Sequence, residues 1–261
     1  MPLRKDFTLK VYYKLLSSII NAGYSILTFK DYLSLTNPSR FVILRHDIDK
    51  SPQLAVKMAE LENSLGVESS YYFRIVRKSN NPNVIKRIAE LGHEIGYHYE
   101  DFTLAKGNYK KAISLFEKNL KYFRKFYPVK TIVSHGSPLT KWNNEDIWSE
   151  YSYTDFGIIG EPSFDVDFNE VFYLTDTGRS WAGEEYIVRD KVVQPFQHKF
   201  SNTFDILNSL RKDKFPEKVL LTAHSQRWQE NVFLWIWELL SQNVKNMLKK
   251  LFFVRNTDKS N

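Results

Sequence analysis

The segment RHDID at residues 45–49 directly follows the apolar run FVIL at residues 41–44. A buried strand that ends in this way carries two carboxylates to its C-terminal end, where parallel α/β folds commonly build their sites. Asp47 and Asp49 stand two residues apart, so their side chains point the same way from an extended chain. One carboxylate could hold a metal ion while the other accepts a proton from water. The alternative is that both aspartates cap a helix beginning at Ser51 and Pro52.

Polar residues recur after other predicted strands. They are His98, Glu100, Asp101, His135, Asp176, Arg179 and His224. The C-terminal ends of strands in a parallel barrel meet at one rim, so we expect these side chains to converge although they are far apart in sequence. Taken singly, each has a structural explanation: His135 could sit in a plain turn, and His224 could be a core histidine bonded to the backbone.

The segment HEIGYH at residues 93–98 contains two histidines that invite comparison with a zinc-protease helix. That motif needs two histidines four residues apart on one helical face. Here they are five residues apart, and Gly96 weakens any helix. We therefore expect a strand, with His98 as a ligand at its end and His93 in a structural role.

The composition limits what can bind a metal. The chain has 261 residues and no cysteine, so disulfides and thiolate ligands are excluded and any metal must sit on histidine, aspartate or glutamate. Hydrophobic residues make up 43% of the chain, which is enough for a large single core. The formal net charge is +7, which favours anionic partners such as nucleotide-sugars or a membrane surface.

Helical and strand patterns alternate along the chain. Helices are predicted at residues 8–22, 52–65, 82–91, 108–126, 203–211 and 231–250. Strands are predicted at residues 41–44, 69–73, 94–98, 131–134, 156–159, 171–174, 191–194 and 218–223. Repeated strand–helix units imply a mostly parallel sheet, and their number suits a closed or partly closed α/β barrel.

The segment GHEIGYH at residues 92–98, downstream of the Asp-x-Asp strand end, resembles the polysaccharide deacetylase family, which includes chitooligosaccharide and peptidoglycan N-deacetylases. The resemblance covers the order of the motifs from residue 41 to residue 228. It implies a distorted (β/α) barrel with one divalent metal, often zinc. It divides the chain into a helical lead-in at residues 1–40, the barrel at 41–228, and a C-terminal amphipathic helix and tail at 229–261.

The resemblance implies roles for individual residues. Asp47 matches the catalytic base, Asp49 and His98 match metal ligands, and His224, in LTAH at residues 221–224, matches the general acid. The family's further histidine ligand would lie four residues after His98, where this chain has Phe102, which cannot bind a metal. The family's Arg-Pro loop corresponds to residues 134–138, where no arginine appears.

His135 can replace the missing ligand. Asp49, His98 and His135 would then supply one oxygen and two nitrogens and leave a position open for water, which is the usual arrangement of catalytic zinc. Glu100 and Asp101 are alternative third ligands. The other outcome is that the metal is lost and the barrel binds a sugar without turnover.

Further residues are expected to meet the substrate. Asp176, Arg179 and Trp181 lie in a segment that corresponds to the family's polar loop beside the acetyl pocket. Arg45 or Arg179 would orient Asp47 by an ion pair, and the other would meet an anionic group of the substrate. Trp181 and Trp228 would stack on the sugar, or else pack in the core.

These inferences predict a metal-dependent hydrolase that removes an N-acetyl or other acyl group from a sugar. With no secretion signal in the sequence, we expect a cytoplasmic location and an acetamido-sugar, nucleotide-sugar or lipid-linked intermediate of capsule or lipopolysaccharide O-antigen biosynthesis. The alternative is an inactive barrel that binds sugar within a glycan assembly complex. No nucleic-acid-binding signature is found.

The last predicted helix carries Phe233, Ile236, Trp237 and Leu240 on one face. This face could dock on the barrel, pair with a second subunit in a homo-oligomer, or lie on the inner membrane as a peripheral contact.

Overall fold

The computed structural model describes residues 5–34, 39–137, 140–181 and 192–249. The strands are β1 (Ser25–Leu27), β2 (Phe41–Ile48), β3 (Ser70–Phe73), β4 (Glu94–Tyr99), β5 (Ile132–Ser134), β6 (Phe172–Thr175) and β7 (Lys218–Ala223). The α-helices are α1 (Leu9–Asn21), α2 (Phe29–Ser34), α3 (Pro52–Ser64), α4 (Pro82–Glu90), α5 (Asp101–Leu104), α6 (Tyr109–Phe123), α7 (Pro162–Asp165), α8 (Thr203–Arg211) and α9 (Val232–Lys249). Short 3₁₀ helices are η1 (Asn144–Ser149), η2 (Tyr153–Phe156), η3 (Thr177–Arg179) and η5 (Ser225–Arg227).

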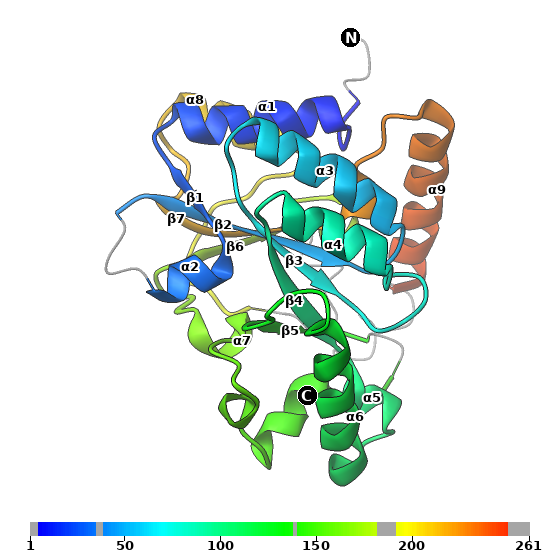
Figure 1. The fold of residues 1–261 in the computed structure, drawn as a ribbon. Coiled ribbons are helices and arrows are strands. Elements are labelled where there is room, and N and C mark those ends of the chain that lie inside the picture. Colours follow the sequence, from blue (N-terminus) through cyan, green and yellow to red (C-terminus); the bar gives the residue numbers. More distant parts are fainter. Residues whose placement is uncertain (1–4, 35–38, 138–139, 182–191, 250–261) are drawn as a thin grey trace, which may run out of the picture.

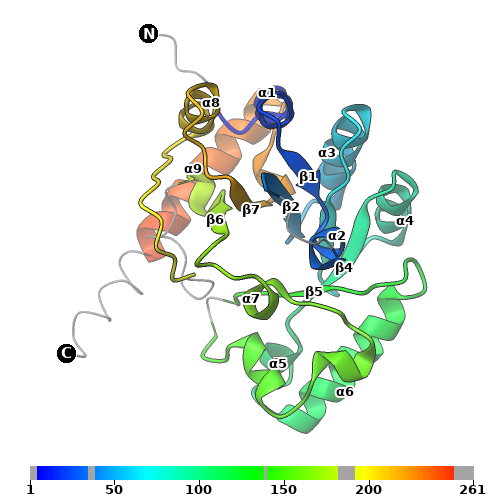
Figure 2. The same ribbon diagram turned by 90° about the vertical axis from the view of Figure 1, so that its left-hand side faces the viewer.

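The strands form one parallel sheet in the order β5-β4-β3-β2-β7-β6, with β1 paired to the first half of β2. Parallel neighbours need long crossover connections, which the helices supply. Figure 2 shows that the sheet curls into a half-barrel, with α8, α1, α3 and α4 arrayed outside it. The predicted α/β class is confirmed, and among the described strands β5 and β6 are the two free edges of the curled sheet.

Most predicted elements lie within a few residues of their expected positions, and α8 and β7 coincide with the prediction. Local sequence explains the start of α8. The Asn202 side chain accepts a hydrogen bond from the backbone N–H of Asp205, and the Asp205 carboxylate accepts one from Asn202. This reciprocal cap satisfies backbone donors that a helix cannot satisfy internally.

Two predicted strands are wrong. At residues 156–159, η2 ends at Phe156, and the nearest pairing is an isolated bridge between Thr131 and Gly160. The strand predicted at residues 191–194 is absent from its described part, residues 192–194. There the Gln194 side chain, rather than a backbone ladder, bonds the backbone of Tyr173 in β6.

Strand β2 carries different chemistry on its two faces. All eight of its residues are buried, and alternation sends Arg45 and Asp47 inward while His46 points outward. The register aligns Asp47 with Tyr72 of β3, and Tyr72 with Gly96 of β4. A Cβ atom at Gly96 would lie only 2.2 Å from the Tyr72 ring, so glycine is needed there to let that ring cross the inner face beside Asp47.

The outer face of β2 is fixed by a buried carboxylate. Glu62 of α3 lies 2.8 Å from His46 Nε2 and accepts hydrogen bonds from Ser69 Oγ at 2.5 Å and Tyr71 Oη at 2.9 Å. Burial alone would raise the pKa of Glu62, but the neighbouring His46 and these hydrogen bonds lower it to about 2. Tyr12 of α1 also donates to Glu62, so this network ties two helices to the strand that carries the site.

Candidate metal and catalytic site

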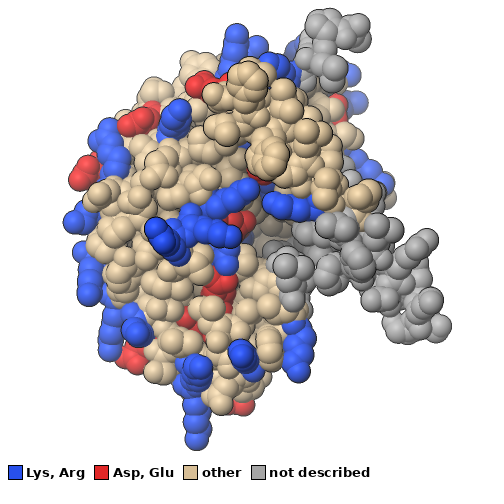
Figure 3. All heavy atoms as spheres, turned by 90° about the vertical axis from the view of Figure 1, so that its right-hand side faces the viewer, with Lys and Arg blue, Asp and Glu red and all other residues tan. Residues whose placement is uncertain are grey.

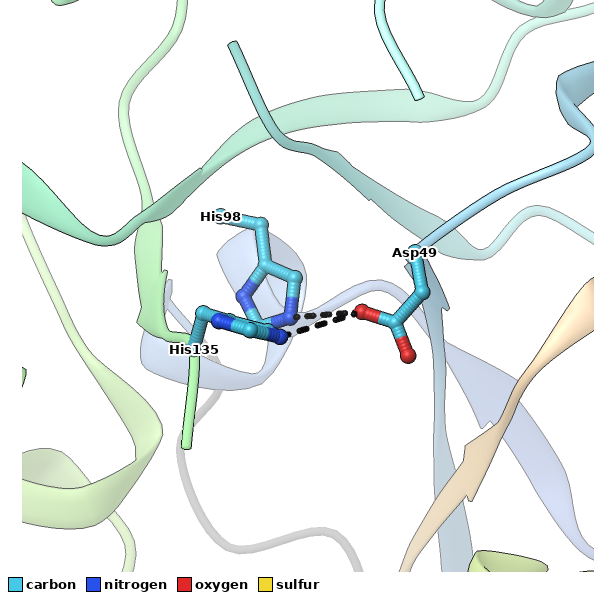
Figure 4. A group of neighbouring side chains, drawn as sticks. All are labelled: Asp49, His98 and His135. Atoms are coloured by element: carbon cyan, nitrogen blue, oxygen red, sulfur yellow. Dashed lines mark ion pairs between the residues drawn. The ribbon is translucent and has the colours of Figure 1, made fainter. Parts of the chain in front are cut away.

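Three predicted ligands converge at the C-terminal ends of their strands. Asp49 follows β2, His98 belongs to β4, and His135 follows β5. Their ligand atoms all lie within 4.8 Å of one another. Figure 4 shows both imidazole rings turned toward the same carboxylate oxygen, with Asp49 Oδ1 at 3.8 Å from His98 Nε2 and 3.6 Å from His135 Nε2.

This arrangement fits a metal ion better than it fits direct pairing. Asp49 Oδ1 is buried and accepts no hydrogen bond within the described residues. Its distances to the two nitrogens are too long for hydrogen bonds. They are close to the roughly 3.3 Å that separates two ligands held at about 2.0 Å in a tetrahedral zinc site. Two imidazoles and one carboxylate therefore form a group that could hold a metal ion, and the donor types suit zinc.

The protonation states of the ligands agree with this role, because metal ligands must be deprotonated. Burial chiefly lowers the pKa of His98, to about 4, so its ring is neutral near neutral pH. Burial would raise the pKa of Asp49, but His135, His224, His98 and Arg74 outweigh burial and lower it. Asp49 is thus an ionised ligand beside a neutral imidazole.

Partners on the far nitrogens orient the two imidazoles. His98 Nδ1 lies 3.1 Å from the carbonyl oxygen of Val133, which can only accept, so Nδ1 carries the proton and Nε2 is free to bind. His135 Nδ1 lies 2.9 Å from Ser137 Oγ and 3.3 Å from Glu100 Oε2. Such partners fix the tautomer and direction of metal-binding histidines. His135 therefore fills the position of the third ligand, for which Glu100 and Asp101 were the alternatives given from the sequence.

Glu100 and Asp101 serve other purposes. Glu100 accepts two hydrogen bonds from Arg74, at 3.1 and 2.6 Å, and these bonds together with His135 lower its pKa to about 2 against the effect of burial. Asp101 accepts from Tyr97 Oη and Asn119 Nδ2, away from the ligands. Phe102, at the position of the family's further histidine, packs in the core against Tyr109.

Asp47 stands beside the ligand group as an ionised carboxylate. Arg45 donates to both of its oxygens, from Nε to Oδ1 at 2.8 Å and from Nη2 to Oδ2 at 2.6 Å. Burial would raise the pKa of Asp47, but Arg45, with smaller effects from His98 and His224, holds it well below its usual range. Nor does any side chain cap the start of α3 at Ser51, so capping does not explain the aspartate pair.

His224 directly follows β7 and lies near Asp49. Its Nδ1 lies 2.7 Å from Asp176 Oδ1, and its Nε2 lies 3.9 Å from Asp49 Oδ2. Asp176 is fully buried and also accepts hydrogen bonds from Arg227 Nη1 at 2.6 Å and Trp228 Nε1 at 3.0 Å. Asp176 therefore positions His224 with its Nε2 toward Asp49, so the expectation that Asp176 meets the substrate is replaced by a positioning role.

Three other residues expected at the substrate lie elsewhere. Arg179 has a positive φ of 59° and stacks over the ring of Trp235 in α9, with its centre 4.5 Å from the ring centroid. Trp181 and Trp228 are 5% and 0% exposed, and both belong to the hydrophobic core around α1. Core packing, the alternative given for the two tryptophans, is what the structure shows.

A cavity of about 250 Å³ is lined by Arg45, the partner of Asp47, and by residues of β5 and β6 at the two ends of the sheet order. Its lining includes Arg45, Ser134 of β5, Glu145, Tyr173 of β6 and Pro162. Arg45 lines this cavity and also binds Asp47, so one side chain links the cavity to the site. A larger surface groove of about 860 Å³ lies between α1 and α8 and contains none of the candidate residues.

Sequence reasoning missed Arg74, Arg227 and Gln226. Arg74 Nη1 lies 3.8 Å from Asp49 Oδ1, and Gln226 Nε2 donates to Asp49 Oδ2 at 3.4 Å. The one available signal was position: Arg74 follows β3 directly, as the other site residues follow their strands. Nothing in the spacing distinguishes Arg227 from an exposed arginine.

Comparison with known proteins gives similarity of fold only. No family model matches the chain, and no curated protein matches it. A CE4 esterase from Streptococcus mutans is similar in structure, with 14% identity over 87% of this chain and 89% of that one and a TM-score of 0.46. A CE4 family pseudoenzyme from Bacillus anthracis gives 13% identity over 82% and 66% of the two chains and a TM-score of 0.45. The peptidoglycan deacetylase PdaC from Bacillus subtilis gives 12% identity over 84% and 100% and a TM-score of 0.40.

Proposed function

We propose that the protein is a metal-dependent hydrolase that removes an acetyl or related acyl group from the nitrogen of a sugar. One observation carries the proposal: the unpaired Asp49 oxygen faces the Nε2 atoms of His98 and His135, and His224 Nε2 lies 3.9 Å from the other oxygen of the same carboxylate. These contacts support a metal site at the C-terminal ends of the strands, with His224 as the proposed proton donor and Asp47 as the proposed proton acceptor.

Asp49, His98 and His135 would hold the ion, and zinc is the metal that suits their donor types. The bound ion would polarise the acyl carbonyl and lower the pKa of the attacking water. Asp47 takes the proton of that water. Because Arg45 depresses the pKa of Asp47, the carboxylate is a weak base and depends on the water being acidified first.

His224 supplies the second proton. Its Nδ1–H donates to Asp176, which orients the ring. Nε2–H can then donate to the nitrogen that leaves as the C–N bond breaks, giving a free amine and a carboxylic acid. Arg45, at the wall of the adjoining cavity, keeps Asp47 ionised and aimed.

The substrate is proposed from charge and chemistry. The net charge of +7 suits an anionic sugar intermediate, such as a nucleotide-sugar or a lipid-linked unit of a surface polysaccharide. A barrel that binds such a sugar without turning it over is the competing function, and Arg74 near Asp49 is the feature that favours it, because a cation 3.8 Å from a ligand oxygen opposes metal binding.

The test is acyl release by the zinc-loaded full chain. Nucleotide-linked, lipid-linked and free N-acetylated and N-formylated sugars are incubated with the protein, and acetate, formate and new amine are quantified. We expect release from one class, reduced about 10²–10⁴-fold in Asp47→Asn and His224→Gln and unchanged in Asp146→Asn, an exposed aspartate outside the site. Sugar binding by zinc-loaded protein without any release would contradict hydrolysis and favour the binding function.

A further inference from the structure

Helix α9 turns its apolar side to solvent. Phe233 is 82% exposed, Trp237 is 72% exposed and Leu240 is 57% exposed. Among the side chains described in this helix, up to residue 247, the exposed apolar ones are Val232, Phe233, Leu234, Ile236, Trp237, Leu240, Val244 and Met247. A surface helix of a globular protein normally buries such a face, so this orientation calls for something that covers it.

Polar contacts hold α9 in this orientation. Glu238 is 7% exposed and pairs with Lys50 at 3.3 Å, on the loop between β2 and α3. Gln242 Nε2 donates to Asn246 Oδ1, and Asn246 Nδ2 donates to the carbonyl of Gly178 in η3, both at 2.8 Å. Turning the apolar face inward would break these bonds and leave buried polar groups unpaired, which is costly.

We propose that the apolar face of α9 docks on the surface of an anionic lipid membrane. Among the helices that the structure describes, none is long and apolar enough to cross a bilayer. An amphipathic helix of this kind lies in the interface, with its apolar side among the acyl chains. Large rings such as Phe233 and Trp237 suit that position because they bury much apolar area at the lipid boundary.

A second copy of the chain fits this face less well. Phe233, Trp237, Leu240, Val244 and Met247 follow the 4-3 spacing of a coiled-coil seam. The flanking positions of such a seam would carry charged pairs that set the partner, but here they hold Leu234, Ile236, Ser241 and Asn243. At about 100° per residue, Leu234 and Ile236 widen the apolar arc of the first helical turns to about 160°, which suits a lipid surface better than a narrow two-helix seam.

Charge also favours an anionic lipid surface. The chain has a net charge of +7, and α9 has no exposed acidic residue, since Glu238, its one acidic residue, is buried against Lys50. Exposed Lys245 flanks the apolar arc on the helix. Figure 3 looks at the side on which α9 stands in Figure 1, and shows a broad tan area above a hollow with Lys and Arg at its border and Asp and Glu inside it. Basic side chains beside an apolar patch bind anionic headgroups while the patch enters the acyl boundary.

Docking would bring the membrane next to the candidate site. Helix α9 packs on η3, which directly follows Asp176, the partner of His224. A lipid-linked substrate could then reach the cavity from the bilayer surface. The docking itself does not depend on the proposed reaction, and it is measured without turnover.

The experiment is flotation of the purified full chain with vesicles of phosphatidylcholine, with and without phosphatidylglycerol. We expect wild type to float with anionic vesicles, less so at high salt, because salt screens the basic residues. Phe233→Glu combined with Trp237→Glu should reduce the bound fraction at least about tenfold, since each ring loses its burial in lipid. Phe164→Glu, at a residue 51% exposed on α7, is the matched control and should bind as wild type does.

Two results would overturn the inference. The first is wild-type protein that stays unbound at low salt with anionic vesicles. The second is a dimer in sedimentation velocity without lipid that the Phe233→Glu and Trp237→Glu double variant converts to monomer, because the face would then belong to a second copy. Circular dichroism of the variants checks the fold, which exposed substitutions should leave intact.

Discussion

Arg45 and Asp47, two residues apart on β2, form a bidentate ion pair inside the half-barrel, with 2.8 Å from Nε to Oδ1 and 2.6 Å from Nη2 to Oδ2. Extended geometry makes the pair possible, since side chains at i and i+2 share one face of a strand. The pair keeps a buried carboxylate ionised and fixes its direction toward the metal ligands. It also ties the base to the cavity that Arg45 lines.

Replacing Arg45 with glutamine should raise the pKa of Asp47. The base must be ionised to accept a proton, so the acidic limb of the pH–rate profile should move to higher pH. We expect kcat to fall about 10²-fold, and the loss of one partner of a buried ion pair to reduce the free energy of unfolding by about 3–5 kcal/mol. Zinc content should stay unchanged, because Arg45 contacts no ligand atom in the structure.

The control is Arg40→Gln. Arg40 pairs with Asp213, whose side chain is 76% exposed, so this variant should change neither the pH profile nor, beyond about 1 kcal/mol, the stability. An Arg45→Gln profile with an unmoved acidic limb would contradict the role of the pair.

Substitutions of Asp176 and of His224 should lower kcat to a similar extent but should differ in their effect on stability. Asp176→Asn removes the acceptor that fixes His224 Nδ1–H, and we expect kcat to fall about 10²–10⁴-fold, as in His224→Gln. Asp176→Asn alone should also destabilise the fold by about 3–5 kcal/mol, because it leaves the buried Arg227 without its counter-charge. Kinetics and urea unfolding of both variants check this; an unchanged kcat in Asp176→Asn would refute the positioning role, and equal stability of the two variants would refute the counter-charge role.

Glu100 should tune metal affinity without being a ligand. Its carboxylate lies 3.3 Å from His135 Nδ1, so Glu100→Gln should weaken zinc binding about 10–100-fold while the stoichiometry at saturating zinc stays the same. Competition with a chelating dye measures this. Asp101→Asn, at a carboxylate bonded to Tyr97 and Asn119 instead, is the control; equal losses in both variants would contradict the assignment.

The contribution of Glu161 to stability should fall as pH rises toward 8. Glu161 is fully buried and accepts hydrogen bonds from the backbone N–H of Ser134 and Ser163. Burial, reinforced by Glu145, raises its pKa to about 8, against roughly 4.3 in an unfolded chain. Between these values the folded protein holds a proton that the unfolded chain releases, so the free energy of unfolding decreases with pH by up to ~1.4 kcal/mol per pH unit.

Urea unfolding of metal-free protein at about pH 5 and about pH 8 tests this linkage. Glu161→Gln cannot ionise, so its stability should decline less than that of wild type over this range. Part of the decline should persist, because burial also raises the pKa of Asp101, to about 7. Identical pH dependence in wild type and Glu161→Gln would rule the contribution out.

The strand-end pattern predicted which polar residues would converge, and the family resemblance selected the ligand group among them. Parallel strands align their C-terminal ends, so Asp49, His98 and His135 could be brought together from sequence alone. The same reasoning could not say which arginine would pair with Asp47. In the structure Arg45 lies within β2, two residues before Asp47, whereas Arg179 lies in η3 with a positive φ and stacks on Trp235.

Other features have no local signal. Trp228 comes after the same strand as His224, yet its ring is fully buried. The backbone turns through η5, and the indole N–H donates a hydrogen bond to Asp176. The 3₁₀ helices are too short to show helical periodicity. The pairing of β1 with β2 covers only three residues, so it depends on tertiary contacts rather than on its own pattern.

The most direct test of the central claim is metal content, measured by mass spectrometry after mild dialysis. The proteins are wild type, Asp49→Ala, His135→Ala and the control His93→Ala. His93 is a suitable control because its hydrogen bonds, to Ser69 and Ala59, lie outside the site. The account predicts near-stoichiometric zinc in wild type and in folded His93→Ala, and its loss in Asp49→Ala and His135→Ala. Wild-type protein that stays empty after zinc is added back, or His135→Ala that keeps its zinc, would contradict it.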